Sequence, residues 1–290
     1  MRLRPLEAVN LAALAVLGAA TLVLWRSLAD PGGILLRYAL MGAFLAIIVF
    51  LTQRMERLPK AVRIAADFYP AAFIAFVYES LDPLIAAARG RPRDDLLIAA
   101  DRAILGGDLS VLLQPVITPF LAAFLYVAYS TYYFLPLVLG GFLWSQDVAA
   151  ARRYIFTLTA CFYVSYAGYF TIPAYGPRTA LSDRNRVPLE TSPIARAISR
   201  TINQLEETKL DAFPSGHTMI ATAVLVVAWR RLRKLFWFLL PIAILLIVST
   251  MYCRYHYLVD VLAGIVLAFA TVPLGDRLYD GLTRAQIARS

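Results

Sequence analysis

The sequence is poor in charge and in the side chains that most often carry chemistry. Only 16% of its 290 residues are charged, and it contains two histidines and two cysteines. No long polar block stands apart from the apolar segments, so a separate soluble domain is not expected. We find no internal repeat, low-complexity tract or run of coiled-coil heptads, which argues against repeat and fibrous architectures.

The net charge of +9 does not indicate a nucleic-acid partner, because no extended basic tract or aromatic stacking surface accompanies it. Lysines and arginines instead cluster at the ends of apolar segments, where anionic lipid headgroups attract them. Cys161 and Cys253 both lie in or near apolar runs. We therefore expect two buried thiols rather than a disulfide.

Apolar side chains are abundant: they make up 60% of the residues, and the mean hydropathy is +0.65. This composition indicates an integral membrane protein. A bilayer admits helices or closed barrels, and long unbroken apolar runs favour helices. The predicted fold is all-α, a polytopic membrane helical bundle. Runs of about 17 to 25 apolar residues predict eight spans, near residues 8–27, 34–52, 67–88, 117–143, 153–174, 214–230, 235–253 and 256–274.

Two of these runs have features that set them apart. The first begins MRLRPLEAVNL and resembles a signal peptide, but it is long enough to span a bilayer and more spans follow, so an uncleaved helix is expected. The third contains Asp67, Glu79 and Asp82, and acids at that depth normally face a protein interior or lie near an interface. For Glu79 a structural role is favoured over a catalytic one.

The distribution of Lys and Arg predicts the topology, because basic residues in short loops resist translocation. Counting eight spans places on one side the basic segments MRLR, 53–63, 149–153 and 230–234. We expect that side to be cytoplasmic and to hold both termini, in a plasma membrane of the bacterial inner-membrane type. The opposite, outer side then receives residues 28–33, 89–116, 175–213 and 254–256.

Two outer segments, DDLLIAADRAIL and SPIARAISRTINQLEE, have apolar residues at helical spacing. They are expected to form helices that either lie flat on the membrane or are solvated. The arginines of loop 89–116 are an exception to the charge rule.

The two histidines of the chain are predicted to reach the same face of the membrane. His217 opens the sixth span and His256 opens the eighth, so they can meet, which favours catalysis over separate structural roles. His256 and Asp260 are spaced i, i+4 and share a helix face, where the carboxylate can hold one ring N–H and leave the other nitrogen as nucleophile or base. Arg254 does not share that face, so we expect it in the preceding turn, with the helix starting near His256.

The segment PSGH at 214–217 is typical of a helix start. Pro214 suits an early helical position, and the residues after it present backbone N–H groups that have no partner inside the helix. Such an end attracts phosphate, and Gly216 permits close approach, although a plain helix start is the alternative. Arg178, in AYGPRTAL just after the fifth span, offers a planar fork matched to phosphate oxygens, whereas snorkelling to headgroups is its ordinary role.

Taken together, an arginine motif, PSGH and H-x-x-x-D over the last four spans resemble the type 2 phosphatidic acid phosphatase (PAP2) superfamily of membrane lipid phosphatases and phosphotransferases. The resemblance covers residues 67–274 as a catalytic membrane domain with a six-helix core. It leaves residues 1–66 as two additional N-terminal transmembrane helices and 275–290 as a cytoplasmic tail.

The resemblance implies a role for each motif residue. His256 would be the nucleophile that forms a phosphohistidine, oriented by Asp260, and His217 would protonate the leaving oxygen and later activate the acceptor. The phosphate would be bound by Arg178, Ser215, Gly216 and Arg254. No metal or other cofactor is implied, and the partners would be a membrane lipid substrate and a water or hydroxyl acceptor within the bilayer.

The motifs depart from the widespread family pattern. Thr171 and Thr179 stand where the first motif usually has lysine and proline, and Ser249 and Thr250 stand where the last motif has Ser-Arg. The sequences GPR, RYH, DFYP and YSTYYFLP look closer to the inositol phosphorylceramide synthase branch. That likeness implies an inositolphosphotransferase type of activity.

The leading hypothesis is a metal-independent phosphohistidine enzyme acting on a lipid-linked phosphate or phosphodiester at the outer membrane surface. Water as the acceptor would make it a phosphatase, and a polyol or sphingolipid hydroxyl would make it a transferase. A multi-span lipid or solute transporter without covalent chemistry is one alternative. A metal-dependent hydrolase that uses His217, His256 and Asp260 as ligands is another, although the chain has no H-E-x-x-H motif.

Overall fold

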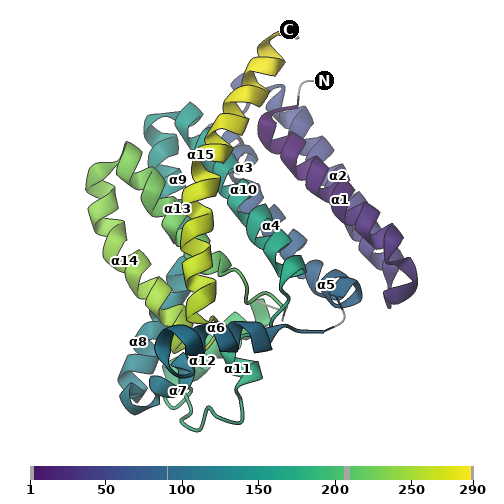
Figure 1. The fold of residues 1–290 in the computed structure, drawn as a ribbon. Coiled ribbons are helices and arrows are strands. Elements are labelled where there is room, and N and C mark those ends of the chain that lie inside the picture. The colour runs from purple at the N-terminus through teal and green to yellow at the C-terminus, as the bar shows by residue number, and fades with distance from the viewer. Residues whose placement is uncertain (1–2, 90, 206–209, 289–290) are drawn as a thin grey trace.

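The structure is a computed structural model that describes residues 3–89, 91–205 and 210–288. It is built from helices, as predicted (Figure 1). Both chain ends lie at one end of a helical bundle, and a layer of short helices covers the opposite end. This covering layer is called the cap, and it consists of α6 (Asp94–Leu105), α7 (Leu109–Leu112), α11 (Pro177–Ala180) and α12 (Pro193–Leu205).

The N-terminal part of the chain is a helical hairpin of α1 (Pro5–Val23) and α2 (Pro31–Thr52), joined by the short helix η1 (Trp25–Ser27). Each long helix has proline at its first position, where the missing N–H costs nothing, and the Asp30 side chain accepts a hydrogen bond from the Gly33 N–H at 2.8 Å. The hairpin packs along the side of the bundle (Figure 1).

The third predicted span is a broken helix. After η2 (Met55–Arg57), it consists of α3 (Lys60–Phe68), α4 (Pro70–Glu79) and α5 (Leu81–Arg89). Pro70 begins α4, because a proline that lacks an N–H cannot continue α3 without losing a hydrogen bond. Glu79 of this segment lies 3.7 Å from Arg37 in a partly exposed ion pair.

The remaining helices form the bundle that carries the histidines. They are α8 (Pro119–Ser130), α9 (Leu135–Gln146), α10 (Val148–Thr171), α13 (Gly216–Arg231), α14 (Arg233–Tyr252) and α15 (Leu258–Ala288), with η3 (Gln114–Val116) before α8 and η4 (Thr131–Tyr133) after it. The axes of α8 and α9 differ by 41°, so the predicted span 117–143 is bent at η4. α15 continues to Ala288, so the segment predicted as a tail is helical as far as it is described.

Fewer helices than the predicted eight have the length and composition of a membrane span. Within the described residues five helices qualify, or six if α8 and α9 form one bent span. The two predicted spans that do not qualify are α10, which contains Arg152 and Arg153, and α13, which has 16 residues. α13 packs against α10, α14 and α15 and is mostly buried by them. A helix enclosed by protein does not need the length or the apolar surface that contact with lipid requires.

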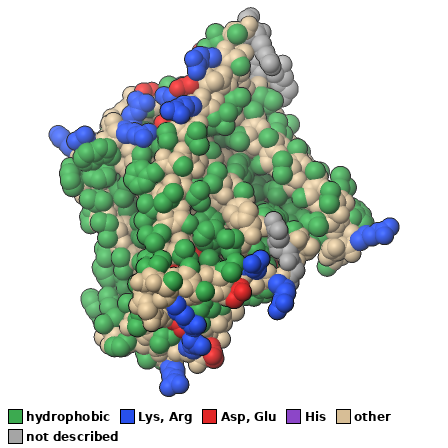
Figure 2. All heavy atoms as spheres, in the orientation of Figure 1, with side chains coloured by type: hydrophobic (Ala, Val, Ile, Leu, Met, Phe, Trp, Pro, Cys, Tyr) green, Lys and Arg blue, Asp and Glu red, His purple; other side chains and the backbone are tan. Residues whose placement is uncertain are grey.

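The surface view agrees with a chain embedded in a bilayer. Figure 2 shows a band of hydrophobic side chains between the two ends of the molecule, with Lys and Arg gathered at both ends. Arg102 in α6 of the cap is one of the arginines of loop 89–116 that are an exception to the charge rule. Cys161 and Cys253 are buried free thiols, as expected.

A buried polar network attaches the N-terminal hairpin to the bundle. The carboxylate of Asp67 accepts hydrogen bonds from Arg4 at 2.5 Å, from Arg152 at 3.0 Å and from the Trp144 indole at 3.0 Å. Arg4 also bonds Glu7 on α1. The acid predicted to face a protein interior therefore does so, and its charge is balanced by two arginines.

Candidate active site

The segment PSGH forms the beginning of α13, with Ser215 as its N-cap. The Ser215 hydroxyl accepts a hydrogen bond from the Thr218 N–H at 3.2 Å, so this side chain caps the helix. The helix begins at Gly216. Pro214 precedes the N-cap residue Ser215 rather than occupying the first turn as predicted. The N–H groups of Gly216 and His217 precede the first bond inside the helix, which leaves them suited to bind an anion.

Gly216 is favoured by packing as well as by its place at the helix start. A Cβ at this position would lie 2.6 Å from the Tyr169 hydroxyl on α10, closer than real Cβ contacts allow. The start of α13 is therefore pressed against α10, and a side chain at position 216 would have to displace the Tyr169 hydroxyl.

The structure brings the two histidines together. Nε2 of His256 lies 3.4 Å from Nδ1 of His217, and both residues are largely buried. His256 lies in the turn between α14 and α15, and α15 begins at Leu258, two residues later than predicted. Although 39 residues separate them in sequence, the two rings meet where α13 and α15 begin.

Two groups orient the ring of His256. Its Nδ1 lies 2.8 Å from the Ala212 carbonyl oxygen and 3.6 Å from Oδ2 of Asp260. Because a carbonyl can only accept, Nδ1 carries the proton and the lone pair of Nε2 is directed at His217. Asp260 therefore shares the orienting role that was predicted for it alone. The contribution of Ala212 comes from a backbone atom, which no sequence pattern could have indicated.

The charge around His256 favours its protonated form. Burial lowers the pKa of His256, but the nearby Asp260 carboxylate, the charge of Asp211 and the Ala212 carbonyl outweigh burial and raise the pKa above its ordinary value. Oδ2 of Asp260 also accepts the Tyr257 N–H at 2.8 Å, which fixes this carboxylate at the start of α15.

Tyrosine rings enclose His217. Tyr132 and Tyr129 pack against its ring with centroid distances of 4.1 and 4.6 Å, and Tyr129 also packs against Tyr255 at 4.7 Å. Tyr129 and Tyr132 belong to the YSTYYFLP segment at the bend between α8 and α9. The bend therefore directs this aromatic wall toward the histidine.

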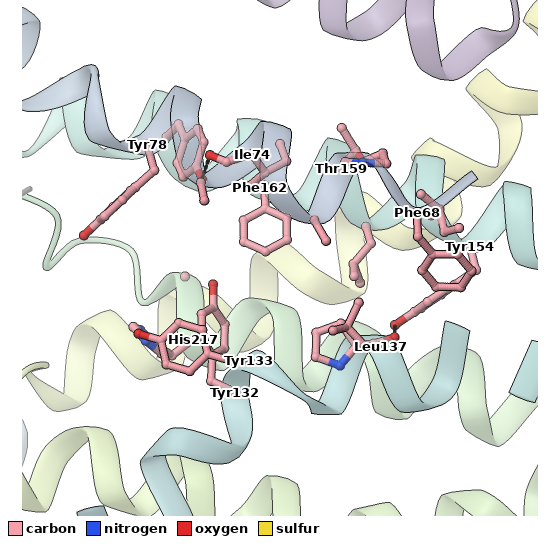
Figure 3. A pocket seen from close by; sticks show the side chains of 18 of the residues that line it. Phe68, Ile74, Tyr78, Tyr132, Tyr133, Leu137, Tyr154, Thr159, Phe162 and His217 are labelled. Carbon is pink, nitrogen blue, oxygen red and sulfur yellow. Dashed lines mark hydrogen bonds between the residues drawn. The ribbon is translucent and has the colours of Figure 1, made fainter. Parts of the chain in front are cut away.

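A cavity of about 210 Å³ opens beside His217. Figure 3 shows His217, Tyr132 and Tyr133 at one end of it, Tyr78 across from them, and Phe68 and Tyr154 at the far end. Its walls come from α4, α9 and α10 and are mostly apolar. At the histidine end, the Tyr78 hydroxyl donates a hydrogen bond to the carboxylate of Asp211, which also lines the cavity.

The two predicted phosphate-binding arginines lie in adjacent loops, because the Arg178 N–H donates to the Arg254 carbonyl at 2.8 Å. The Arg178 guanidinium donates to Glu190 at 2.6 Å and to the hydroxyls of Tyr255 and Ser199 at 2.9 and 3.1 Å. Burial alone would raise the pKa of Glu190, but Arg178 and the hydroxyl donors lower it below its ordinary value.

Arg254 lies in the turn before α15, as predicted, with a positive φ of 67°. One of its terminal nitrogens donates to the Val187 carbonyl at 2.7 Å. Its Nε is buried and has no acceptor among the described residues. The arginine loops connect to the histidines through the packed rings of Tyr255 and Tyr129.

Sequence reasoning missed several residues of this site. Glu190, the partner of Arg178, lies in an irregular loop with no pattern that would draw attention to it. The tyrosines of YSTYYFLP were noted only for their family likeness, and their contact with His217 depends on the bend at η4. In the described part of the chain, no group of three His, Cys, Asp or Glu side chains is arranged to hold a metal ion.

The fold and the site define an integral membrane protein with a histidine pair at a helix N-terminus beside an apolar cavity. The sequence model of the PAP2 superfamily matches residues 96–274, which is more than half of the chain. The chain therefore belongs to the PAP2 superfamily, and this membership supports an enzyme of the phosphatase or phosphotransferase type. The match runs from α6 into α15 and leaves out the N-terminal hairpin. Neither a curated protein nor a solved structure matches the chain.

Proposed function

We propose that this protein is a lipid phosphatase or phosphotransferase that works through a phosphohistidine on a lipid-linked phosphate. The observation that carries the proposal is the 3.4 Å contact between His256 Nε2 and His217 Nδ1 at the start of α13. A ring nitrogen that carries a lone pair stands beside a second imidazole that can move a proton, which is the pairing that nucleophilic catalysis needs.

The reaction has two steps. In the first, Nε2 of His256 attacks phosphorus, the bond between phosphorus and the leaving oxygen breaks, and His217 gives its proton to that oxygen. In the second, His217 takes a proton from water or from an alcohol, whose oxygen attacks the phosphohistidine and breaks the P–N bond. Both histidines then return to their starting protonation states.

The phosphoryl oxygens would be held by the helix end and the arginines. The N–H groups at the start of α13 and the helix dipole favour negative charge there. The buried Nε of Arg254 is a donor that a phosphate oxygen would satisfy. Arg178 would exchange the Glu190 carboxylate for phosphate, because both fit the same planar fork.

The cavity supports a lipid as the alcohol part of the substrate. It opens beside His217, the group that serves the leaving oxygen, and its apolar walls suit a hydrocarbon chain. A transferase is the second candidate function, because the Asp211 carboxylate lines the same cavity and can accept a hydrogen bond from an acceptor hydroxyl. Transfer of inositol phosphate to a sphingolipid hydroxyl is the form that the motif likeness favours.

The test is to incubate the purified protein with lipid phosphates and phosphoinositides that carry radioactive phosphorus, and to measure free phosphate, new lipid and labelled protein. The label should be stable in base and lost in acid, and His256→Ala should abolish it. His217→Ala should turn over lipid phosphate slowly but recover on p-nitrophenyl phosphate, whose leaving group needs no proton. Lipid movement across vesicles that survives His256→Ala, without phosphate release, would instead favour the transporter.

We propose that the site lies at the outer membrane surface, because the distribution of Lys and Arg among the loops predicts that the opposite end of the bundle is cytoplasmic. Because both native cysteines are buried, a new surface cysteine can be labelled selectively. In intact cells an impermeant maleimide should label Arg186→Cys, in the exposed loop between α11 and α12, whereas Arg231→Cys at the opposite end should need permeabilisation. The reverse pattern would place the site in the cytoplasm.

A further inference from the structure

Helix α6 crosses the end of the bundle within the cap (Figure 1). It carries Asp94 and Asp101, which are two helical turns apart and therefore share a face. Both carboxylates are buried, whereas the neighbouring Asp95 is exposed. The buried acids point into the region where the loops of the candidate active site meet.

Asp101 caps the helix that follows the nucleophile. Its two carboxylate oxygens accept the backbone N–H groups of Leu258 and Val259, each at 2.9 Å. These N–H groups open α15 and have no acceptor inside their own helix. A carboxylate is a strong acceptor there and is also favoured by the helix dipole. The capping carboxylate of α15 thus comes from another helix, and it binds the chain two residues beyond His256.

Asp94 joins the two functional loops. One of its oxygens accepts the Tyr175 N–H at 3.0 Å, and the other accepts the Gly176 N–H and the Tyr257 hydroxyl, both at 2.9 Å. Tyr175 and Gly176 lead into the loop of Arg178, and Tyr257 follows His256 directly. A single buried carboxylate therefore fixes the arginine loop relative to the histidine turn.

We propose that Asp94 and Asp101 are positioning residues, through which α6 sets the placement of His256 relative to the loop of Arg178. The inference rests on the proposed function for its catalytic consequence. The two carboxylates act through the backbone and Tyr257 and need not touch substrate. The two carboxylates accept five hydrogen bonds, three from Tyr175, Gly176 and Tyr257 and two from the start of α15. Loosening them misplaces the nucleophile, and a misplacement of about 1 Å costs about 100-fold in rate.

The test compares three aspartate-to-asparagine variants of this region. Asp101→Asn keeps the shape of the side chain but replaces one carboxylate oxygen by an NH2 group, which faces a backbone N–H of α15 and cannot accept from it. We therefore expect kcat to fall by about 10- to 100-fold with little change in KM. Asp95→Asn, on the same helix and exposed, should behave as wild type. Asp108→Asn weakens the ion pairs of Asp108 with Arg102 and Arg184, and should lower stability while keeping kcat.

Amide hydrogen exchange supplies a readout that does not depend on activity. The N–H groups of Leu258 and Val259 should exchange faster in Asp101→Asn than in wild type, and at the wild-type rate in Asp95→Asn. Unchanged exchange, or an equal loss of kcat in Asp101→Asn and Asp108→Asn, would overturn the proposal. If the wild-type protein releases no phosphate and takes up no label, the proposed function fails, while the exchange rates still decide whether Asp101 holds the histidine turn.

Discussion

Gly176 is a position where one added methyl group should disrupt the site. Its φ of 83° and ψ of 169° fall in a region open essentially only to glycine. A Cβ there would lie 2.3 Å from the backbone oxygen of Tyr255. Because that oxygen belongs to the chain between Arg254 and His256, it cannot rotate away, and the loops must part to admit the methyl group.

The size of the effect follows from this geometry. Ordinary contacts of a Cβ begin at 3.4 Å, so Gly176→Ala requires a displacement of roughly 1 Å. Backbone strain adds about 1–3 kcal/mol, and the steric overlap adds about 1–3 kcal/mol more. The hydrogen bond from Arg178 to the Arg254 carbonyl lies next to the displaced segment. We therefore expect kcat/KM to fall by about 100-fold.

Gly106 provides the matched control. It also has a positive φ, 73°, but no atom lies within 4 Å of the position of its Cβ. Gly106→Ala should lower stability by about 1–2 kcal/mol and leave turnover intact. Thermal unfolding in detergent and phosphate release from a lipid phosphate measure the two quantities. If Gly176→Ala turned over substrate as fast as Gly106→Ala, the argument that these loops are held at fixed separation would be wrong.

Three further predictions concern the charges of the site. As the proposed nucleophile, His256 must be neutral to attack, and because its pKa is raised, activity should be lost on acidification at a pH above about 6.5. Asp260→Asn removes the charge that raises this pKa and should move the acidic limb of the kcat/KM profile to lower pH; an unmoved limb would contradict the assignment. Arg254→Lys should lower kcat/KM by about 10- to 100-fold, since an ammonium cannot replace two donors in one plane, and unchanged turnover would make Arg254 structural. Glu190→Gln should lower KM for the lipid phosphate by up to about fivefold, because the carboxylate no longer competes with the substrate for Arg178. The inhibition constant for the product phosphate should fall in parallel.

The fold class could be predicted because hydrophobicity dominates this sequence. Long apolar runs leave few options other than helices, and all eight predicted segments contain helix. The breaks within these segments could not be predicted. The third and fourth segments break at Pro70 and at η4, and the short α13 is stabilised by its neighbours rather than by lipid. Such breaks depend on tertiary packing, which periodicity in one segment does not reveal.

The histidine pair could be predicted because topology alone brings two helix starts to one face. The i, i+4 spacing predicted that the side chains of His256 and Asp260 meet, and they lie 3.6 Å apart, although His256 precedes the helix and does not share a helix face with Asp260. The partners that come from elsewhere could not be predicted. Ala212 contributes a backbone carbonyl, Asp101 contributes a carboxylate that caps α15 from a distant helix, and Glu190 contributes a counter-ion from an irregular loop. None of these roles has a sequence pattern tied to it.

Both chain ends lie at the end of the bundle opposite the cap (Figure 1). A tag or fusion partner joined to either one is therefore remote from the histidine pair. Protein reconstituted in nanodiscs and immobilised through such a tag would present the cap to solution. That orientation suits screening for antibodies or small ligands that recognise the loops of the site. The sequence of these loops would remain unchanged.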